Sequence, residues 1–258
     1  MSKAIWTHGA VRLLTGLAAP LLLGGAVWAQ PAPSACGSLE NGNNGPFDYT
    51  TERGKKLAVV EEFHFTPVVE SLIRGQSGSV GQDLDYTLTV YPNHHRALMA
   101  LMRLSEKART PQPAGARFPV ECYFERALRF RSTDNVSRMI YATFLGKNGR
   151  TADAVKQLEL ADKTAGDSPF THNNIGLIYF DMKDYDKALQ QAHKAIALGF
   201  VQTTLQDQLK QVGKWSDPPA EAAAATASAP ATGGPATGGA TEPSGPVSEG
   251  ASPKANSN

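Results

Sequence analysis

The sequence lacks a strong net charge of either sign. It holds 25 Lys and Arg residues against 24 Asp and Glu residues, a formal balance of +1. The first 29 residues contain Lys3 and Arg12 but no acid, so the remainder holds 23 basic and 24 acidic residues. Such a chain has no electrostatic reason to seek nucleic acid or an anionic lipid surface. This argues against a DNA- or RNA-binding role.

Long apolar runs are also missing after the N-terminus. The early run "LLTGLAAPLLLGGAV" has 15 residues, whereas a spanning helix needs about 20. It follows the basic residues and precedes the small residues of "VWA", which predicts a signal peptide over residues 1–29, cut near Ala29–Gln30. We therefore expect a periplasmic or secreted protein with no stable membrane insertion after cleavage. A retained N-terminal anchor is the alternative; a lipid on Cys36 is less favoured, because Pro33 stands where that signal has an aliphatic residue.

Cysteine is scarce, with only Cys36 and Cys122. In an oxidising compartment such a pair is more often bridged than free, so we predict a disulfide that closes a loop of 86 residues. The chain has no C-x-x-C sequence, and Cys122 lies in "VECYFERAL", which has an amphipathic helical pattern. A redox or nucleophilic role therefore has little support.

Catalytic motifs are absent too. The sequence contains neither G-x-S-x-G nor H-E-x-x-H, and its glycine-rich stretch "GQSGSVGQ" lacks the Lys-Ser/Thr ending of a phosphate loop. The acidic residues Glu61 and Glu62 are adjacent, which is more typical of a solvated helix face than of an acid/base pair. We predict no enzymatic activity, no catalytic residue and no cofactor.

The adjacent histidines of "YPNHHRALMALMRL" raise the question of a metal or haem site. Consecutive helical residues point about 100° apart, so His94 and His95 cannot both face one metal from a regular helix. No histidine follows either of them at the four-residue spacing of a helical metal site. Asn93 or His94, just after Pro92, instead suits the start of a packed helix. We predict no metal ligands here.

The C-terminal segment, residues 217–258, is rich in Ala, Gly, Pro, Ser and Thr and contains Val247 as its only sizeable aliphatic residue. Such a segment cannot bury enough apolar surface to offset its ordering entropy, so we expect it to be disordered. Residues 36–216 remain as folded material, enough for one domain.

Small residues in this part recur at intervals of 34. The interval separates Ala154 from Ala188 and Ala142 from Gly176, and it occurs twice in the series Ala127, Ala161, Ala195. The clearest unit spans 168–200 and divides into two helical patterns around "MKDYD". Gly176 and Ala188 are small where two helices would cross closely, and Asp184 can cap the second helix.

These residues resemble the tetratricopeptide repeat (TPR) family. The resemblance rests on Ile175-Gly176, Tyr179, Lys183-Asp184-Tyr185, Ala188, Ala192 and Ala195. Ala192 replaces the usual aromatic residue, and Phe200 stands near the usual Pro. The resemblance implies an all-α fold, a short helix-turn-helix solenoid of about three repeats closed by a capping helix. Phrases such as "GPFDYTT" and "FHFTPVVESLIRG" are similar to a group of exported bacterial TPR proteins, some labelled as transporter components.

The predicted organisation follows the repeat register. After the signal peptide we expect a loop-rich, helical N-terminal region (30–91), a degenerate repeat with an insertion (92–134), two further repeats (135–168 and 169–202) and a capping helix (203–216). The apolar stripe of this last helix is Leu205, Leu209, Val212 and Trp215. A solenoid needs such a cap, because its final helix pair would otherwise expose an apolar face.

The resemblance also implies a concave groove, formed by the first helices of successive repeats, that holds a peptide or protein partner. The matching positions are Val136, Met139, Thr143, Lys147, Phe170, Asn173, Asn174, Leu177 and Asp181. Asn174 matches the position at which peptide-binding relatives contact the ligand backbone, although Asn173 and Asn174 also suit a simple polar helix start. We therefore expect a non-enzymatic adaptor or assembly factor that binds a protein or peptide of the cell envelope. The alternative is an accessory binder of a metal, haem or small ligand that serves an envelope transport or respiratory system.

Overall fold

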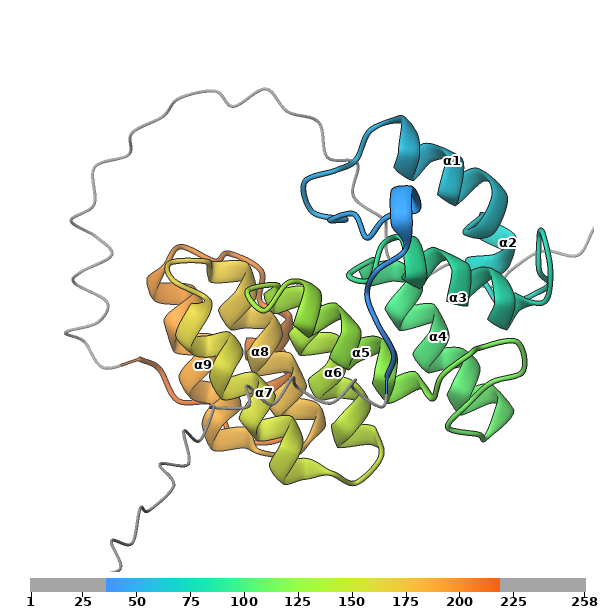
Figure 1. Ribbon diagram of the computed structural model, residues 1–258. Coiled ribbons are helices and arrows are strands. Elements are labelled where there is room, and N and C mark those ends of the chain that lie inside the picture. Colours follow the sequence, from blue (N-terminus) through green and yellow to red (C-terminus); the bar gives the residue numbers. More distant parts are fainter. Residues whose placement is uncertain (1–35, 219–258) are drawn as a thin grey trace, which may run out of the picture. The chain divides into compact units, whose positions relative to one another are not determined.

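The computed structural model describes residues 36–218. Every helix belongs to the compact unit 39–258. Within the described residues the chain is all-α, with ten α-helices, one short 3-10 helix and no strand (Figure 1). The predicted signal peptide, and all but the first two residues of the predicted tail, lie outside the described residues.

The N-terminal half of the described chain forms four α-helices after a 3-10 turn. They are η1 (Gly42–Asn44), α1 (Lys55–His64), α2 (Pro67–Glu70), α3 (Val80–Val90) and α4 (His95–Ala108). A break separates α1 from α2: Pro67 opens α2, where its missing N–H costs nothing, and the Thr66 side chain caps the helix. Ser79 and Gln82 form a reciprocal capping box that starts α3.

Six helices follow, and four of them form two tightly packed pairs. They are α5 (Val120–Phe130), α6 (Asn135–Lys147), α7 (Thr151–Thr164), α8 (Pro169–Asp181), α9 (Tyr185–Ala197) and α10 (Thr204–Gln211). Helix α6 pairs with α7, and α8 pairs with α9 (Figure 1). Helix α6 also contacts α4 and α8, so α4, α6 and α8 follow one another as neighbours, and α10 packs against both α8 and α9.

Helices α4, α6 and α8 begin with the same turn. Their N-cap residues are His94, Asp134 and Ser168, and each N-cap side chain accepts a hydrogen bond from the backbone N–H three residues later. Each N-cap N–H also donates to the carbonyl three residues earlier, at 3.0, 3.1 and 3.2 Å respectively. Three turns of identical bonding thus place the three helices in equivalent positions.

Six of the described helices also end alike, with one residue in the left-handed conformation. These residues are Leu72, Arg109, Gly149, Lys183, Gly199 and Gly213, with φ of 58°, 51°, 74°, 64°, 87° and 68°. In each case the next residue donates its N–H to the carbonyl five positions earlier, as Asp184 does to Tyr179. This bond satisfies a carbonyl that the helix end would otherwise leave without a partner.

Small residues set the distance between the paired helices. Ala154 and Ala188 are fully buried, as are Ala142 and Ala161. A Cβ on Gly176 of α8 would lie 2.5 Å from Leu205 Cδ2 of α10 and 3.3 Å from the Ala188 carbonyl of α9. The close crossing predicted at Gly176 and Ala188 is therefore present.

The last helix differs from the prediction in its length. Leu205 and Leu209 are buried, but α10 ends at Gln211 and Val212 is 42% exposed. The prediction that Val212 continues the apolar stripe is wrong, because the left-handed turn at Gly213 breaks the helical register. Trp215 lies beyond that turn, half-buried against the core.

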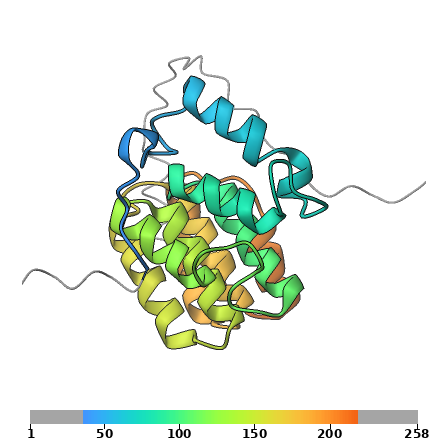
Figure 2. The same ribbon diagram turned by 45° about the vertical axis from the view of Figure 1, so that its right-hand side comes forward.

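A second, smaller core lies under α1. Leu57 and Val60 of α1 pack with Tyr49, Val90 and Tyr91, and Figure 2 shows α1 running beside α3. The Phe47 N–H donates to the Val90 carbonyl at 2.8 Å, which fastens the segment before α1 to the end of α3.

Candidate functional site

His94 begins α4 from a fully buried position. Its Nδ1 accepts the N–H of Ala97 at 3.1 Å, and its Nε2 lies 3.2 Å from Glu61 Oε1. Because Nδ1 is an acceptor, the proton of the neutral ring is on Nε2, which donates to Glu61. Burial lowers the pKa of His94 although Glu61 opposes it, so the ring is neutral near pH 7. Both ring nitrogens are thus engaged within the fold, and the predicted helix start after Pro92 is confirmed.

His95 makes a separate contact, to the residue that caps α6. Its Nε2 lies 2.8 Å from Asp134 Oδ2, and the same carboxylate accepts the N–H and hydroxyl of Ser137. Burial acts to raise the pKa of Asp134, but the hydrogen bonds from His95, Ser137 and Asn93 outweigh it, and the pKa lies below its usual value. The carboxylate is therefore ionised over the neutral pH range.

Asn93 connects these turns to the segment before α1. Its side-chain N–H₂ donates to Asp134 Oδ2 at 3.0 Å and to Asp48 Oδ1 at 2.9 Å, while its Oδ1 accepts the Tyr49 N–H at 3.0 Å. The Tyr49 ring lies 4.1 Å from the His94 ring, centroid to centroid. Asn93, His94 and Asp134 are at most 6% exposed. This polar cluster joins three segments of the fold and has no surface open to a ligand.

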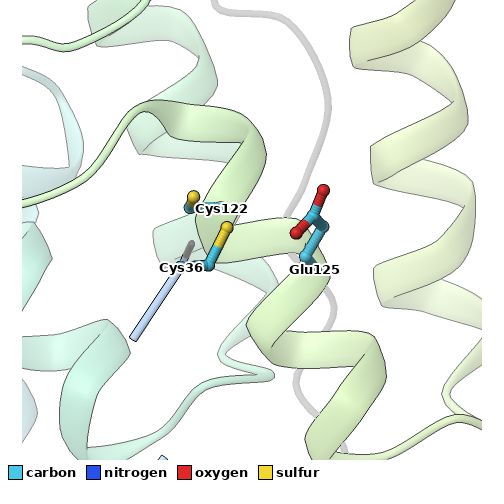
Figure 3. Close-up of side chains that lie close together, drawn as sticks. All are labelled: Cys36, Cys122 and Glu125. Atoms are coloured by element: carbon cyan, nitrogen blue, oxygen red, sulfur yellow. The ribbon is translucent and has the colours of Figure 1, made fainter. Parts of the chain in front are cut away.

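The two cysteines are both disulfide-bonded, and no described cysteine is free. Together with Glu125, one turn after Cys122 on α5, they are the one group among the described residues that meets the spacing of a metal site, with ligand atoms within 4.8 Å (Figure 3). A disulfide sulfur is not a thiolate, and the thiolate is the form that ligates metal. This group is therefore not a metal centre in the oxidised protein.

A surface pocket of about 250 Å³ lies between α6 and α8. Five of the predicted groove residues line it: Val136, Met139, Thr143, Asn174 and Leu177. Ile140 and Ile178 complete the lining. The pocket is mainly apolar, and its two polar side chains are the exposed amide of Asn174 and the hydroxyl of Thr143, which donates to the Met139 carbonyl.

A second pocket of about 440 Å³ continues along the same two helices. It shares Thr143 and Ile178 with the first and reaches Lys147 and Asp181. Lys147 Nζ lies 2.9 Å from Glu106 of α4, so this cation is held beside the pocket. Together the two pockets form a groove between α6 and α8 that is apolar at the start of the helices and charged at their ends.

Two predicted groove residues lie elsewhere. Asn173 is buried at 7% exposure and lines neither pocket. Phe170 is 64% exposed at the start of α8, and its ring packs edge-on against Phe200 at 5.3 Å between centroids. Asn173 is turned by about 100° from its neighbour Asn174, whereas Phe170 shares the helix face of Asn174 but lies one turn before the pocket.

Sequence reasoning missed several residues that complete the groove. Ile178 follows Leu177 in α8, and Gly146 lies two turns after Met139 on the same face of α6. Thr151, Met182 and Lys183 come from the turns at the helix ends. The seven-residue spacing of Gly146 from Met139 could have identified Gly146 as a groove residue. No helical period could have identified the residues at the helix ends.

No helix among the described residues is long and apolar enough to cross a membrane. No protein-family model, no curated protein and no solved structure matches this chain. The described part of the chain is thus assigned to the all-α class from its own structure.

Proposed function

We propose that this protein is a non-enzymatic adaptor or assembly factor of the TPR type, exported to the cell envelope, that binds a peptide segment of a partner protein in the groove between α6 and α8. The observation that carries the proposal is the continuity of the two pockets, which share Thr143 and Ile178. A groove that follows two neighbouring helices suits an extended segment better than a compact small molecule.

The repeat assignment has separate support. The identical turns at His94, Asp134 and Ser168 start every second helix, α4, α6 and α8, and the last two turns are 34 residues apart. Helix α10 lies against the final pair and buries Leu205 and Leu209, as a capping helix would. About three repeats with a cap is the arrangement that we propose.

The lining of the groove suggests the type of peptide. The apolar pocket would take one or two apolar side chains, and Asn174 would bond to the peptide backbone beside them. Lys147 and Asp181 carry opposite charges at the far end, so neither a strongly acidic nor a strongly basic segment is favoured. We propose an internal segment with alternating apolar and polar residues.

The alternative of a metal or haem accessory has less support. His94 and His95 make hydrogen bonds to Ala97, Glu61 and Asp134 within the fold. A metal on either ring would have to replace these bonds, and a metal on Nδ1 of His94 would also remove the cap of α4.

The test is selection of peptides on the purified protein, followed by fluorescence polarisation with single variants. We expect Val136→Glu and Asn174→Ala each to weaken binding of a selected peptide by about tenfold, since each removes a central contact of a small interface. Leu160→Glu is the matched control, because Leu160 on α7 is 43% exposed and Val136 is 41% exposed. Selected peptides whose affinity is unchanged by both groove variants would contradict the proposal.

A further inference from the structure

A separate pocket lies in the N-terminal part of the fold, away from the groove. It has a volume of about 490 Å³ and lies between α1, α3 and the segment before α1. Pockets that hold small ligands measure roughly 300–1,000 Å³. Its apolar lining is Phe47, Val59, Val60, Tyr86 and Val90, and the remaining lining residues are Asn44, Lys55 and Lys56.

The walls of this pocket are held in place by contacts outside it. Phe47 is fixed by its N–H bond to the Val90 carbonyl and by the Tyr91 ring, 5.6 Å away between centroids. The Tyr86 ring lies 3.9 Å from the His64 ring. A preformed wall loses little conformational entropy when a ligand binds.

Apolar surface remains open inside the pocket. Leu57 and Val60 point inward and are each 6% exposed, whereas Val59 is 45% and Tyr86 43% exposed. Packing of α1 on α3 therefore leaves an apolar cavity that a hydrocarbon chain could fill. Binding of such a chain would be favoured in proportion to the apolar surface that it removes from water.

The charged residues that line this pocket are both positive. Lys55 and Lys56 are its charged lining residues, and no acid lines it. Lys56 Nζ lies 4.0 Å from the centre of the Phe47 ring, and within residues 36–218 neither lysine forms an ion pair. Glu52 shares a smaller adjoining pocket with both lysines, but its Oε1 accepts the Asp48 N–H at 2.9 Å. An apolar cavity beside two unpaired ammonium groups complements a ligand with one anionic end and an apolar chain.

We propose that this pocket binds a monoanionic amphiphile of the fatty-acid type, with its chain against Phe47, Val59 and Tyr86 and its carboxylate beside Lys55 and Lys56. The site is independent of the groove between α6 and α8, so either proposal can fail without the other.

The experiment is calorimetric titration of the full-length protein with sodium decanoate below its micelle concentration. We expect one molecule bound per chain, and binding about tenfold weaker for the Lys55→Gln, Lys56→Gln double variant, because two favourable charge contacts are lost. Val59→Glu should weaken binding by about tenfold or more, since it places a carboxylate against the apolar chain. Decyltrimethylammonium, with the same chain and the opposite charge, should bind more weakly than decanoate.

Two matched controls accompany these variants. Val201→Glu makes the same change at a site that is 88% exposed, and Lys163→Gln removes a charge from exposed surface on α7; both should bind decanoate like the unaltered protein. Equal binding of the two amphiphiles, or equal affinity of the Val59 and Val201 variants, would overturn the proposal. It would also be overturned if decanoate fails to bind while anionic phospholipid vesicles, or a protein crosslinked from position 59, occupy this surface.

Discussion

Gly176 shows how a single residue sets the spacing of three helices. A Cβ at this position would meet Leu205 of α10 and the Ala188 carbonyl of α9, and Leu205 is fully buried. A glycine inside a helix costs about 1 kcal/mol relative to alanine. Glycine is favoured at this position because the packing that it allows between α8 and its neighbours contributes more stability than the glycine costs.

We predict that Gly176→Ala lowers the free energy of unfolding by about 1–3 kcal/mol, the usual cost of overpacking a core. The measurement is equilibrium unfolding in urea. Gly146→Ala is the control in another helix, because its Cβ would meet Met182 Cγ at 3.3 Å, and that flexible side chain can move. Gly146→Ala should be neutral or stabilising by up to about 1 kcal/mol. Equal losses at both positions would contradict the account of close crossing.

The neutral ring of His94 predicts a pH dependence. Burial lowers the pKa of His94 in the folded state, whereas the unfolded chain has a histidine pKa of about 6.5. Below pH 6.5 the unfolded state takes up a proton that the folded state refuses, so stability falls as the pH falls. The slope for one such group approaches about 1.4 kcal/mol per pH unit.

His94→Asn should reduce this slope between pH 6.5 and pH 5 while it keeps a side chain that can cap α4. Urea unfolding at several pH values measures the effect. His193→Asn is the comparison, because it makes the same substitution at a histidine that is only partly buried on α9. A slope that is unaltered by His94→Asn would show that His94 is not the buried neutral group that the structure describes.

At the scale of elements, helix ends are more regular than their residue types suggest. Six of the described helices end with a left-handed residue, yet three of those residues are Leu72, Arg109 and Lys183 rather than glycine. A side chain in this conformation costs roughly 1–2 kcal/mol. Lys183 stands 34 residues after Gly149 and makes the same turn.

Lys183→Gly should therefore raise the midpoint of thermal unfolding by a few degrees, equivalent to about 1 kcal/mol. Lys163→Gly, inside α7, should lower stability by a similar amount, since glycine there only weakens a helix. Destabilisation at both positions would contradict the left-handed turn at Lys183.

The elements themselves were largely predictable. The cap at Asp184 and the helix start near His94 were predicted from local residue chemistry, and the structure confirms both. The end of α10 was not predicted correctly. Leu205, Leu209 and Val212 fit one apolar stripe, but the helix ends at Gln211, before the left-handed turn at Gly213. Local chemistry indicates starts and caps well, whereas an apolar stripe alone does not show where a helix stops.

Contacts between distant segments were harder to predict. Seven of the nine predicted groove residues line the groove, because a correct repeat register assigns all the residues of one helix face together. The bonds of Asn93 to Asp48 and Asp134 cross more than 40 positions, and no periodicity indicates them. The pocket beneath α1 was missed for the same reason, because it combines Phe47, Val59 and Tyr86 from three segments.

For the whole molecule, the predicted disulfide between Cys36 and Cys122 should raise the free energy of unfolding. The chain-entropy relation gives about 4–5 kcal/mol as an upper figure for a loop of this length. We expect Cys36→Ser, Cys122→Ser to lower the free energy of unfolding by up to that amount. Peptide mapping with and without reductant identifies the bridge directly, and two alkylated thiols in the unreduced protein would contradict it.

We propose above that the groove between α6 and α8 holds a protein partner. This proposal is tested most directly by photocrosslinking in living cells, with a benzophenone amino acid at Val136 and, as the control, at Leu160, which is equally exposed. The account predicts one dominant adduct from position 136 that is lost on Asn174→Ala and absent from position 160. The same diffuse labelling from both positions would contradict the account, because the groove would then be ordinary surface.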